Sequence, residues 1–260
     1  MCSFCAEETK RLEFIAHLEE IRRRILFVIC IVICFTIISF WQIDRIMMFV
    51  TTPIKKYVPE LIFISPTEAF SSYIKLALLS GVVFTFPFML YQLGAFVLPA
   101  FKIKARRRLL LWLFSGAVLF YAGLMFSYFI AIPAALDFLL TFKSEFVTAR
   151  ITLGKYVSFF SALIFVGGFI FEIPVIAAFL TDAGIVNAHM LKAKRKYAVL
   201  LIAVLAAVIT PTQDIFNMLL FAVPMVVLYE ISIFISGIIE KSKLSKNVFN
   251  TNMSDNTINS

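Results

Sequence analysis

Residues 25–41 read ILFVICIVICFTIISFW and contain no charged side chain. A transmembrane helix needs roughly 20 predominantly apolar residues, so this run is long enough to enter a bilayer. It follows the basic, amphipathic stretch AHLEEIRRR at residues 16–24, it has no small-residue cleavage site, and further hydrophobic segments come after it. These features predict a retained membrane helix and not a secretory signal peptide.

The composition of the whole chain agrees with a membrane environment. Of its 260 residues, 61% are hydrophobic, only 15% are charged, and 30 are phenylalanine. A soluble domain of this size could not cover so much apolar surface with so few charges. The formal net charge is +8, but the basic residues stand in short clusters between hydrophobic stretches. Such clusters indicate membrane topology rather than nucleic-acid binding.

The apolar segments predict an all-α integral membrane protein with six transmembrane helices, forming a single domain over residues 1–240. The expected spans are residues 25–41, 74–98, 109–133, 156–180, 197–209 and 215–239. The fifth span is the shortest, because it would reach only about 20 Å across a hydrocarbon core of about 30 Å. Prolines within or beside several spans favour kinked helices and a cupped body.

The connections between the spans alternate in charge. Basic residues concentrate before the first span, in the second and fourth connections, and after the sixth span. The positive-inside rule therefore places both termini in the cytoplasm. Residues 241–260 are rich in Asn, Ser and Lys, and they predict a disordered cytoplasmic tail. The outer connection at residues 42–73 contains apolar stretches such as IDRIMMFV that can lie along the membrane surface.

Few residues suit catalysis or metal binding. The only histidines are His17 and His189, and no HExxH, GxSxG or phosphate-loop motif is present. Cys2 and Cys5 form a CxxC that would need two more ligands to hold zinc. The sequence therefore predicts neither an enzyme nor a protein that needs a metal or another cofactor.

Two glutamates precede the first span beside three arginines. Read as a helix, Glu19 is four residues before Arg23 and Glu20 is four residues before Arg24. One interpretation is a pair of intrahelical ion pairs, each contributing a few tenths of a kcal/mol. The other is that a carboxylate at the membrane surface accepts a guanidinium group from a cationic ligand. The residues alone leave both interpretations open.

Glu172 stands inside the fourth predicted span, in GGFIFEIPVIAAF at residues 167–179. An ionised carboxylate there costs at least roughly 2.5 kcal/mol, so the group is expected to be protonated, paired or in a wet groove. One interpretation is a neutral acid that binds a carbonyl freed by Pro174, and the other is a polar functional site. An alternative function follows from Glu172, namely a proton- or ion-coupled secondary transporter. The chain shows no internal repeat of the kind that transporters usually contain.

Several stretches, taken in order, resemble the TatC family, the multi-spanning receptor subunit of the twin-arginine protein translocase. These stretches are HLEEIRRRI, SPTEAF, YIKLAL, PFMLYQLGAFVLPAF, LFYAGLMFSYF, FEIPV, TPTQD, AVPM and YEI. Each motif is weak alone, but the ordered set is specific and covers about residues 14–240. The resemblance implies a cupped, six-helix membrane protein that recognises twin-arginine signal peptides of folded cargo. It also implies TatA and TatB as single-span partners, self-association in a receptor complex, and the proton-motive force as the energy source.

The resemblance also assigns roles to individual residues. The acidic residue and the arginine of the family's N-terminal motif correspond to Glu20 and Arg22, and its aromatic residue in the second span corresponds to Phe96. The intramembrane glutamate corresponds to Glu172, and the proline of the first outer loop corresponds to Pro53. The chain is expected to be a multi-pass protein of the bacterial inner membrane, since no transit peptide precedes residue 14.

Two positions depart from the family pattern. A carboxylate common in the first cytoplasmic loop is replaced by Ala105, so that one part of the expected acidic patch is missing. Glu19 could compensate as an acidic neighbour of Glu20, although it points about 100° away around the helix. A glutamine common near the start of the sixth span is replaced by Met218, so the polar side chain that would contact a partner at that end of the span is missing.

Overall fold

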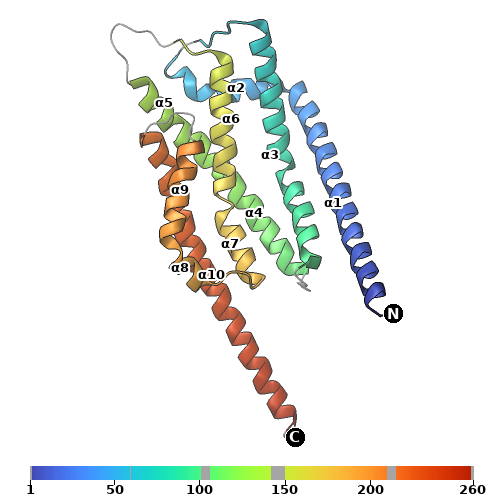
Figure 1. The fold of residues 1–260 in the computed structure, drawn as a ribbon. Helices are drawn as coiled ribbons and strands as arrows, with labels where there is room; N and C mark the ends of the chain where they lie inside the picture. Colours follow the sequence, from blue (N-terminus) through green and yellow to red (C-terminus); the bar gives the residue numbers. More distant parts are fainter. Residues whose placement is uncertain (1, 59, 101–105, 142–149, 210–214, 259–260) are drawn as a thin grey trace. The chain divides into compact units, whose positions relative to one another are not determined.

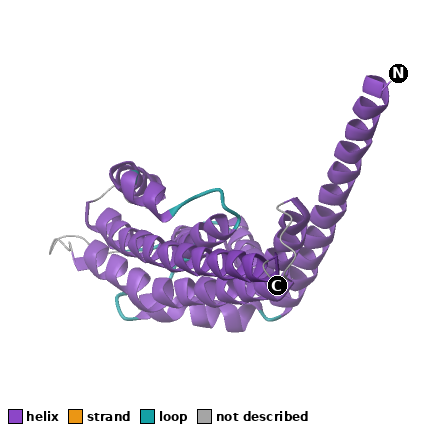
Figure 2. Ribbon diagram, turned by 90° about the horizontal axis from the view of Figure 1, so that it is seen from below, coloured by secondary structure: helices purple, strands orange, loops and turns teal. Residues whose placement is uncertain are grey.

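The structure is a computed structural model that describes residues 2–58, 60–100, 106–141, 150–209 and 215–258. In these ranges the backbone forms helices joined by short loops, without a β-strand (Figure 1 and Figure 2). The elements are α1 (Cys2–Trp41), α2 (Ile43–Lys55), α3 (Pro66–Ala100), α4 (Arg106–Phe126), the π-helical η1 (Ser127–Ala131), α5 (Ile132–Thr141), α6 (Leu153–Ile170), α7 (Ile173–Asp182), α8 (Ala188–Ala193), α9 (Arg195–Ile209) and α10 (Ile215–Ile258). The all-α prediction is confirmed.

Within the described residues, five helical stretches are long and apolar enough to cross a membrane. These are Glu19–Trp41, Pro66–Phe96, Leu110–Leu140, Leu153–Asp182 and Met218–Lys241. Each contains all or nearly all of one predicted span. The remaining predicted span, residues 197–209, lies in α9, which has 15 residues and is therefore about 22 Å long. A helix of that length is short for a hydrocarbon core of about 30 Å, as the sequence predicted.

The chain divides into two compact units. The first comprises Met1–Thr52, Glu60–Ala117 and Ile151–Ser161, and the second comprises Pro53–Pro59, Val118–Arg150 and Ala162–Ser260. In the first unit, α1 and α3 lie side by side and run antiparallel (Figure 1). Gly81 permits their close approach, because a Cβ atom there would collide with the Thr36 hydroxyl of α1. Phe35 adds ring contacts to Phe84 and Phe88 at centroid distances of 6.4 and 6.3 Å.

The first unit also contains a hydrogen-bonded junction around Glu68. Glu68 lies in the first turn of α3, where its Oε2 accepts the Ile64 N–H at 3.0 Å and its Oε1 accepts the Gly154 N–H at 2.9 Å. Next to it, Leu153 N–H donates to Ile62 O at 2.8 Å across an isolated β-bridge. One carboxylate thereby joins the connection before α3 to the beginning of α6.

The outer connection differs from the loop that the sequence predicted around Pro53. Residues 43–55 form the amphipathic helix α2, in which Phe49 is exposed and Val50 is buried. Pro53 lies inside this helix. Pro53 lacks the N–H group that would donate to the carbonyl four residues before it, and α2 ends at Lys55, within one turn of the proline. The stretch IDRIMMFV is thus helical, with one exposed and one buried face, and Pro53 is part of the last turn of α2.

In the second unit, α10 packs beside α7, α8 and α9 (Figure 1). Polar contacts join these helices. Thr181 Oγ1 donates to Ser236 Oγ at 2.9 Å in a buried contact, and the Tyr229 hydroxyl donates to Leu191 O at 2.9 Å in a part-buried one. Elsewhere in this unit, Ser127 of η1 donates to Leu163 O at 3.1 Å. A Cβ atom at Gly167 would collide with that serine hydroxyl, so close helix packing requires glycine there.

Both ends of the described chain are more helical than the sequence predicted. The first helix begins at Cys2, and α10 continues to Ile258, through the region that composition predicts to be disordered. Residues 238–258 contain neither proline nor glycine. Helix propagation needs only local hydrogen bonds once a turn has formed, so α10 continues beyond its membrane-spanning part. A composition that predicts disorder indicates that a segment has no apolar face to bury, and this property is different from the ability to form local helical hydrogen bonds.

Candidate functional site

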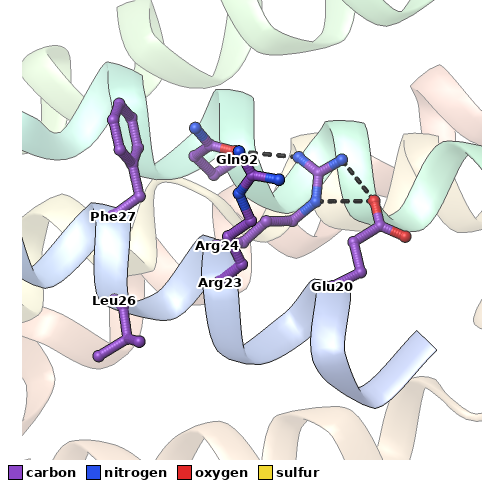
Figure 3. A pocket seen from close by; sticks show the side chains of 6 residues that line it. All are labelled: Glu20, Arg23, Arg24, Leu26, Phe27 and Gln92. Carbon is purple, nitrogen blue, oxygen red and sulfur yellow. Dashed lines mark hydrogen bonds and ion pairs between the residues drawn. The ribbon is translucent and has the colours of Figure 1, made fainter. Parts of the chain in front are cut away.

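A pocket of the first unit lies between α1 and α3 (Figure 3). It has a volume of about 610 Å³ and is partly open. The lining residues are Glu20, Arg23, Arg24, Leu26 and Phe27 from α1, and Gln92 from α3. Its lining therefore combines one carboxylate, two guanidinium groups and an amide with apolar side chains.

Arg24 is the centre of the polar contacts in this pocket. Its Nη2 and Nε donate to Glu20 Oε1 at 2.6 and 3.0 Å, and its Nη1 donates to Gln92 Oε1 at 2.9 Å (Figure 3). The side chains of Arg24 and Glu20 are 26% and 39% exposed, so the ion pair is partly shielded from solvent. Partial shielding strengthens a charge-assisted hydrogen bond relative to one in water.

The local sequence explains this arrangement. Residues four apart lie on the same face of a helix, so Arg24 reaches back to Glu20. That face of α1 is turned toward α3, where Gln92 is a polar side chain within an apolar span. Leu26 and Phe27 follow on the next turn of α1 and supply the apolar wall. The pocket thus lies at the boundary between the basic stretch and the first apolar span.

The predicted residues beside Glu20 are placed differently. The Glu20–Arg24 ion pair is confirmed, but the described contacts include no ion pair between Glu19 and Arg23. Glu19 and Arg22 are exposed and do not line the pocket, because they lie on other faces of α1. Among the predicted site residues of α1, only Glu20 therefore lines the pocket.

Phe96 lies one helical turn after Gln92 on α3, and its side chain is half-buried. Since α1 and α3 run antiparallel, Phe96 is displaced from Gln92 toward the end where α1 begins (Figure 1). The remaining loop position, Ala105, lies outside the described residues. Gln92 and Arg24 are the functional candidates that sequence reasoning missed, although a glutamine in an apolar span is a detectable signal.

Glu172 belongs to the second unit and lies where α6 ends and α7 begins. The residue is 4% exposed, and its Oε1 has no hydrogen-bond partner among the described residues. The expected hydrogen bond from this carboxyl group to a carbonyl freed by Pro174 is therefore not made through Oε1.

Met218 lies near the beginning of α10 and is half-buried. In the described part of the chain, no three His, Cys, Asp or Glu side chains are placed to hold a metal ion.

These features define the class of the protein. It is an α-helical, multi-span membrane protein with a pocket in which a carboxylate and an amide oxygen hold a guanidinium group against apolar side chains. The family described as "Sec-independent protein translocase protein (TatC)" matches residues 16–224. The chain therefore belongs to the TatC family, and the resemblance found in its motifs is confirmed.

Individual relatives agree with this assignment. The Sec-independent protein translocase protein TatC of Koribacter versatilis is 35% identical over 92% of this chain and 90% of its own length. The protein of the same name from Carboxydothermus hydrogenoformans is 34% identical over 92% of this chain and 98% of its own length. A solved structure of the twin-arginine translocase receptor TatC is 34% identical, covers 86% of this chain and 99% of its own, and superimposes with a TM-score of 0.77.

Family membership settles two broader predictions. The chain is a component of a protein-translocation system and not an enzyme. It is also a multi-pass membrane protein, as its apolar helices and its relatives indicate. The alternative of a secondary transporter that uses Glu172 is not favoured by any of these relatives.

Proposed function

We propose that this chain recognises twin-arginine signal peptides on folded proteins and that the Glu20 carboxylate accepts a guanidinium group of the peptide. The observation that supports this proposal is the contact between Glu20 and the guanidinium group of Arg24. A carboxylate that already binds one arginine in this pocket has the geometry to bind another. The name of the solved relative, a twin-arginine translocase receptor, points in the same direction.

The apolar part of the signal peptide would follow the apolar side of the same pocket. Leu26 and Phe27 line it on α1. Phe96 lies one turn beyond Gln92 on α3, toward the beginning of α1, and would contact an apolar part of the peptide on the other side of Arg24. Burial of apolar side chains contributes roughly 25 cal/mol per Å² and does not depend on sequence in detail. In this proposal the charged contact provides the specificity and the apolar surface provides much of the affinity. Arg22 would keep the beginning of the apolar span of α1 at the charged membrane surface.

The topology proposed from the sequence completes this function. The proposed topology has six spans, with the short α9 as the fifth. An even number of spans would put both termini on one side, and the basic connections would make that side the cytoplasm, where signal peptides are presented. The location would be the bacterial inner membrane, with export driven by the proton-motive force. TatA- and TatB-type single-span subunits would be the partners, together with other copies of this chain. Glu172 and Met218 are the candidate positions for contacts with those partners.

The direct test is peptide binding to the purified full-length protein. A labelled peptide with the Arg-Arg pair should bind, and the same peptide with Lys-Lys should bind more weakly. Glu20→Gln should weaken binding at least about tenfold, because a hydrogen bond to a charged group contributes about 1.5–3 kcal/mol. Equal binding of the Arg-Arg peptide by the wild type and Glu20→Gln would refute the role of Glu20.

Glu19→Gln is the matched control for this experiment. It removes the same charge from the adjacent position, but Glu19 does not line the pocket. A much smaller loss of peptide affinity than that of Glu20→Gln is expected, and equal losses would mean that both carboxylates bind the peptide.

Separately, Ala105→Glu restores the loop carboxylate of the family and should tighten peptide binding. An unchanged affinity would show that the acidic patch is already complete without it.

A further inference from the structure

The corner between α8 and α9 in the second unit is strongly basic. Residues 191–197 read LKAKRKY, so that four of seven consecutive residues are lysine or arginine. The first helix ends at Ala193, the second begins at Arg195, and the two meet at Lys194. All three lysines of this stretch, Lys192, Lys194 and Lys196, are exposed. The positive-inside rule accounts for the sign of this charge but not for how the structure arranges it.

Two contacts hold the α8–α9 corner (residues 191–197) against α10, which lies beside it (Figure 1). The Tyr229 hydroxyl donates to Leu191 O at 2.9 Å, and Arg195 Nη2 donates to Glu230 Oε2 at 2.8 Å. Glu230 thereby offsets the charge of Arg195. The ion pairs among the described residues include none to the three lysines of the corner. The corner therefore presents three uncompensated cations on a backbone that is fixed to its neighbour.

Another exposed lysine of the second unit has a similar aromatic neighbour but different surroundings. Lys56 Nζ lies 5.5 Å from the centroid of the Tyr57 ring, and Lys196 Nζ lies 5.2 Å from that of the Tyr197 ring. The Tyr57 hydroxyl donates to the carboxylate of Asp137 in α5, which lies at the end of the unit opposite to α8 (Figure 1). A carboxylate is therefore close to the first lysine–tyrosine pair, whereas the described contacts place none on the second.

The basic corner continues directly into an exposed apolar face. Tyr197 is 63% exposed, and the exposed side chains of Leu200, Leu201 and Val204 follow it at spacings of three, four and seven residues. Residues at these spacings share one face of a helix. Because α9 is about 22 Å long and a hydrocarbon core is about 30 Å thick, the bilayer beside α9 must become thinner or the residues at its ends must reach outward. Both adjustments bring lipid phosphate groups and the lysines of the corner together.

We propose that the α8–α9 corner binds an anionic phospholipid, with the headgroup at Lys192, Lys194 and Lys196 and the acyl chains along the exposed face of α9. A zwitterionic lipid also carries a phosphate group, but its own ammonium group offsets that charge. The corner therefore selects phosphatidylglycerol over phosphatidylcholine, as basic sites beside membrane helices select anionic headgroups. A soluble anion would use the lysines alone, whereas a lipid uses the apolar face as well. Peptide recognition at Glu20 is not needed for this binding, so the two proposals can fail separately.

The experiment measures lipid binding to the purified full-length protein in a neutral detergent. Phosphatidylglycerol and phosphatidylcholine with identical acyl chains are titrated, and native mass spectrometry counts the lipids bound. The wild type should bind phosphatidylglycerol at least about fivefold more tightly. Replacement of any one of the three lysines by glutamine should weaken phosphatidylglycerol binding about fivefold, the loss expected for one basic residue near an anionic surface. The affinity for phosphatidylcholine should change little.

Three further variants separate a site from general charge. The triple variant Lys192→Gln/Lys194→Gln/Lys196→Gln should lose at least about twentyfold in phosphatidylglycerol affinity, because its three losses combine. The matched control removes the same charge from three exposed lysines outside the corner, as Lys55→Gln/Lys56→Gln/Lys155→Gln, and should lose less than about twofold. The unfolding temperature in the same detergent confirms that each variant is folded.

The third variant, Arg195→Gln/Glu230→Gln, keeps the net charge but removes one of the two contacts that hold the corner against α10. It should weaken phosphatidylglycerol binding at least about twofold, because the lysines are no longer held in place. An unchanged affinity would overturn the role of the fixed arrangement.

Several results would overturn the lipid site itself. Equal losses in the corner triple and in the matched control would mean that general charge attracts the lipid. Equal binding of the two lipids by the wild type would show that the corner does not select anionic headgroups. Displacement of phosphatidylglycerol by inorganic phosphate, beyond that by chloride at the same ionic strength, would indicate a site for soluble phosphate groups. Full retention of phosphatidylglycerol by the corner triple would leave the lysines to an acidic protein partner instead.

Discussion

Glu20 and Glu68 are two carboxylates of the first unit that differ in the groups that donate to them. The Glu68 carboxylate accepts the backbone N–H groups of Ile64 and Gly154 at 3.0 and 2.9 Å. The Glu20 carboxylate accepts hydrogen bonds from the side chain of Arg24. Backbone donors are fixed by the fold, whereas an arginine side chain can rotate away at small cost. The first carboxylate is therefore suited to hold the structure together and the second to exchange its partner.

The positions of the two residues agree with this distinction. Glu68 lies in the first turn of α3, with Ser65 just before the helix, so it satisfies donors at a helix beginning as in a capping box. Glu20 lines a pocket that is partly open. The comparison predicts that substitutions at Glu68 reduce stability, and that substitutions at Glu20 reduce ligand binding with little change in stability.

Glu68→Ala should produce the largest loss of stability in this series. It removes both acceptors of the junction and leaves the Ile64 and Gly154 N–H groups without their carboxylate partner. The unfolding temperature in detergent and the amount of protein in the membrane should both fall. Both should fall less for Glu68→Gln, because its amide oxygen still accepts one hydrogen bond. Peptide binding per folded molecule should be unchanged. Normal stability of Glu68→Ala would show that the junction is not structural.

Gly154→Ala tests the same junction from the opposite side. A Cβ atom at this position would lie 2.8 Å from Glu68 Cγ and 2.9 Å from Glu68 Oε1, so the carboxylate would have to move. Overpacking of this kind costs about 1–3 kcal/mol. The expected result is therefore an unfolding temperature below that of the wild type. If the double variant Glu68→Ala/Gly154→Ala unfolds at the same temperature as Glu68→Ala, the collision with Glu68 explains the effect of the alanine. A further drop in the double variant would assign that effect to another contact.

The sequence predicts contacts along one helix better than contacts between helices. The pairing of Glu20 with Arg24 was predicted from their spacing of four residues. The capping role of Glu68 was not predicted, although the SPTE pattern at residues 65–68 has the spacing of a capping box. The contacts of Arg24 with Gln92 and of Glu68 with Gly154 depend on how distant segments align. No local pattern specifies that alignment, so these two contacts appear only in the structure.

The same distinction explains the other differences. The apolar runs predicted the five helical stretches that are long and apolar enough to cross a membrane, and they predicted that α9 is short, because burial in lipid depends on length and composition. The end of α10 at Ile258 was missed, because composition reports on burial and not on local backbone hydrogen bonds. For Glu172, the sequence indicated a costly buried carboxyl group but not that its Oε1 has no partner among the described residues.

Glu172 extends the comparison to a carboxyl group that is buried without a partner for one oxygen among the described residues. Glu172→Met replaces it with an apolar side chain of similar length, which should stabilise the protein by about 1 kcal/mol because a buried unsatisfied oxygen is removed. The measurement is the unfolding temperature, with Glu172→Gln as the polar control. A more stable variant that no longer exports cargo or crosslinks to its partners would show that the carboxyl group serves function at the expense of stability. A less stable Glu172→Met would show that the group has a structural role.

The smallest effect on stability is expected for Glu20→Gln. A partly exposed ion pair four residues apart on a helix contributes a few tenths of a kcal/mol, and the glutamine oxygen still accepts a hydrogen bond from Arg24. The unfolding temperature should therefore remain close to that of the wild type, and the small difference should shrink further as NaCl is added, because salt screens exposed charges. Peptide binding by the same preparation should nevertheless be strongly weakened. A decrease in stability as large as that of Glu68→Ala would place Glu20 among the structural carboxylates, and the difference between the two glutamates would no longer indicate which of them binds a ligand.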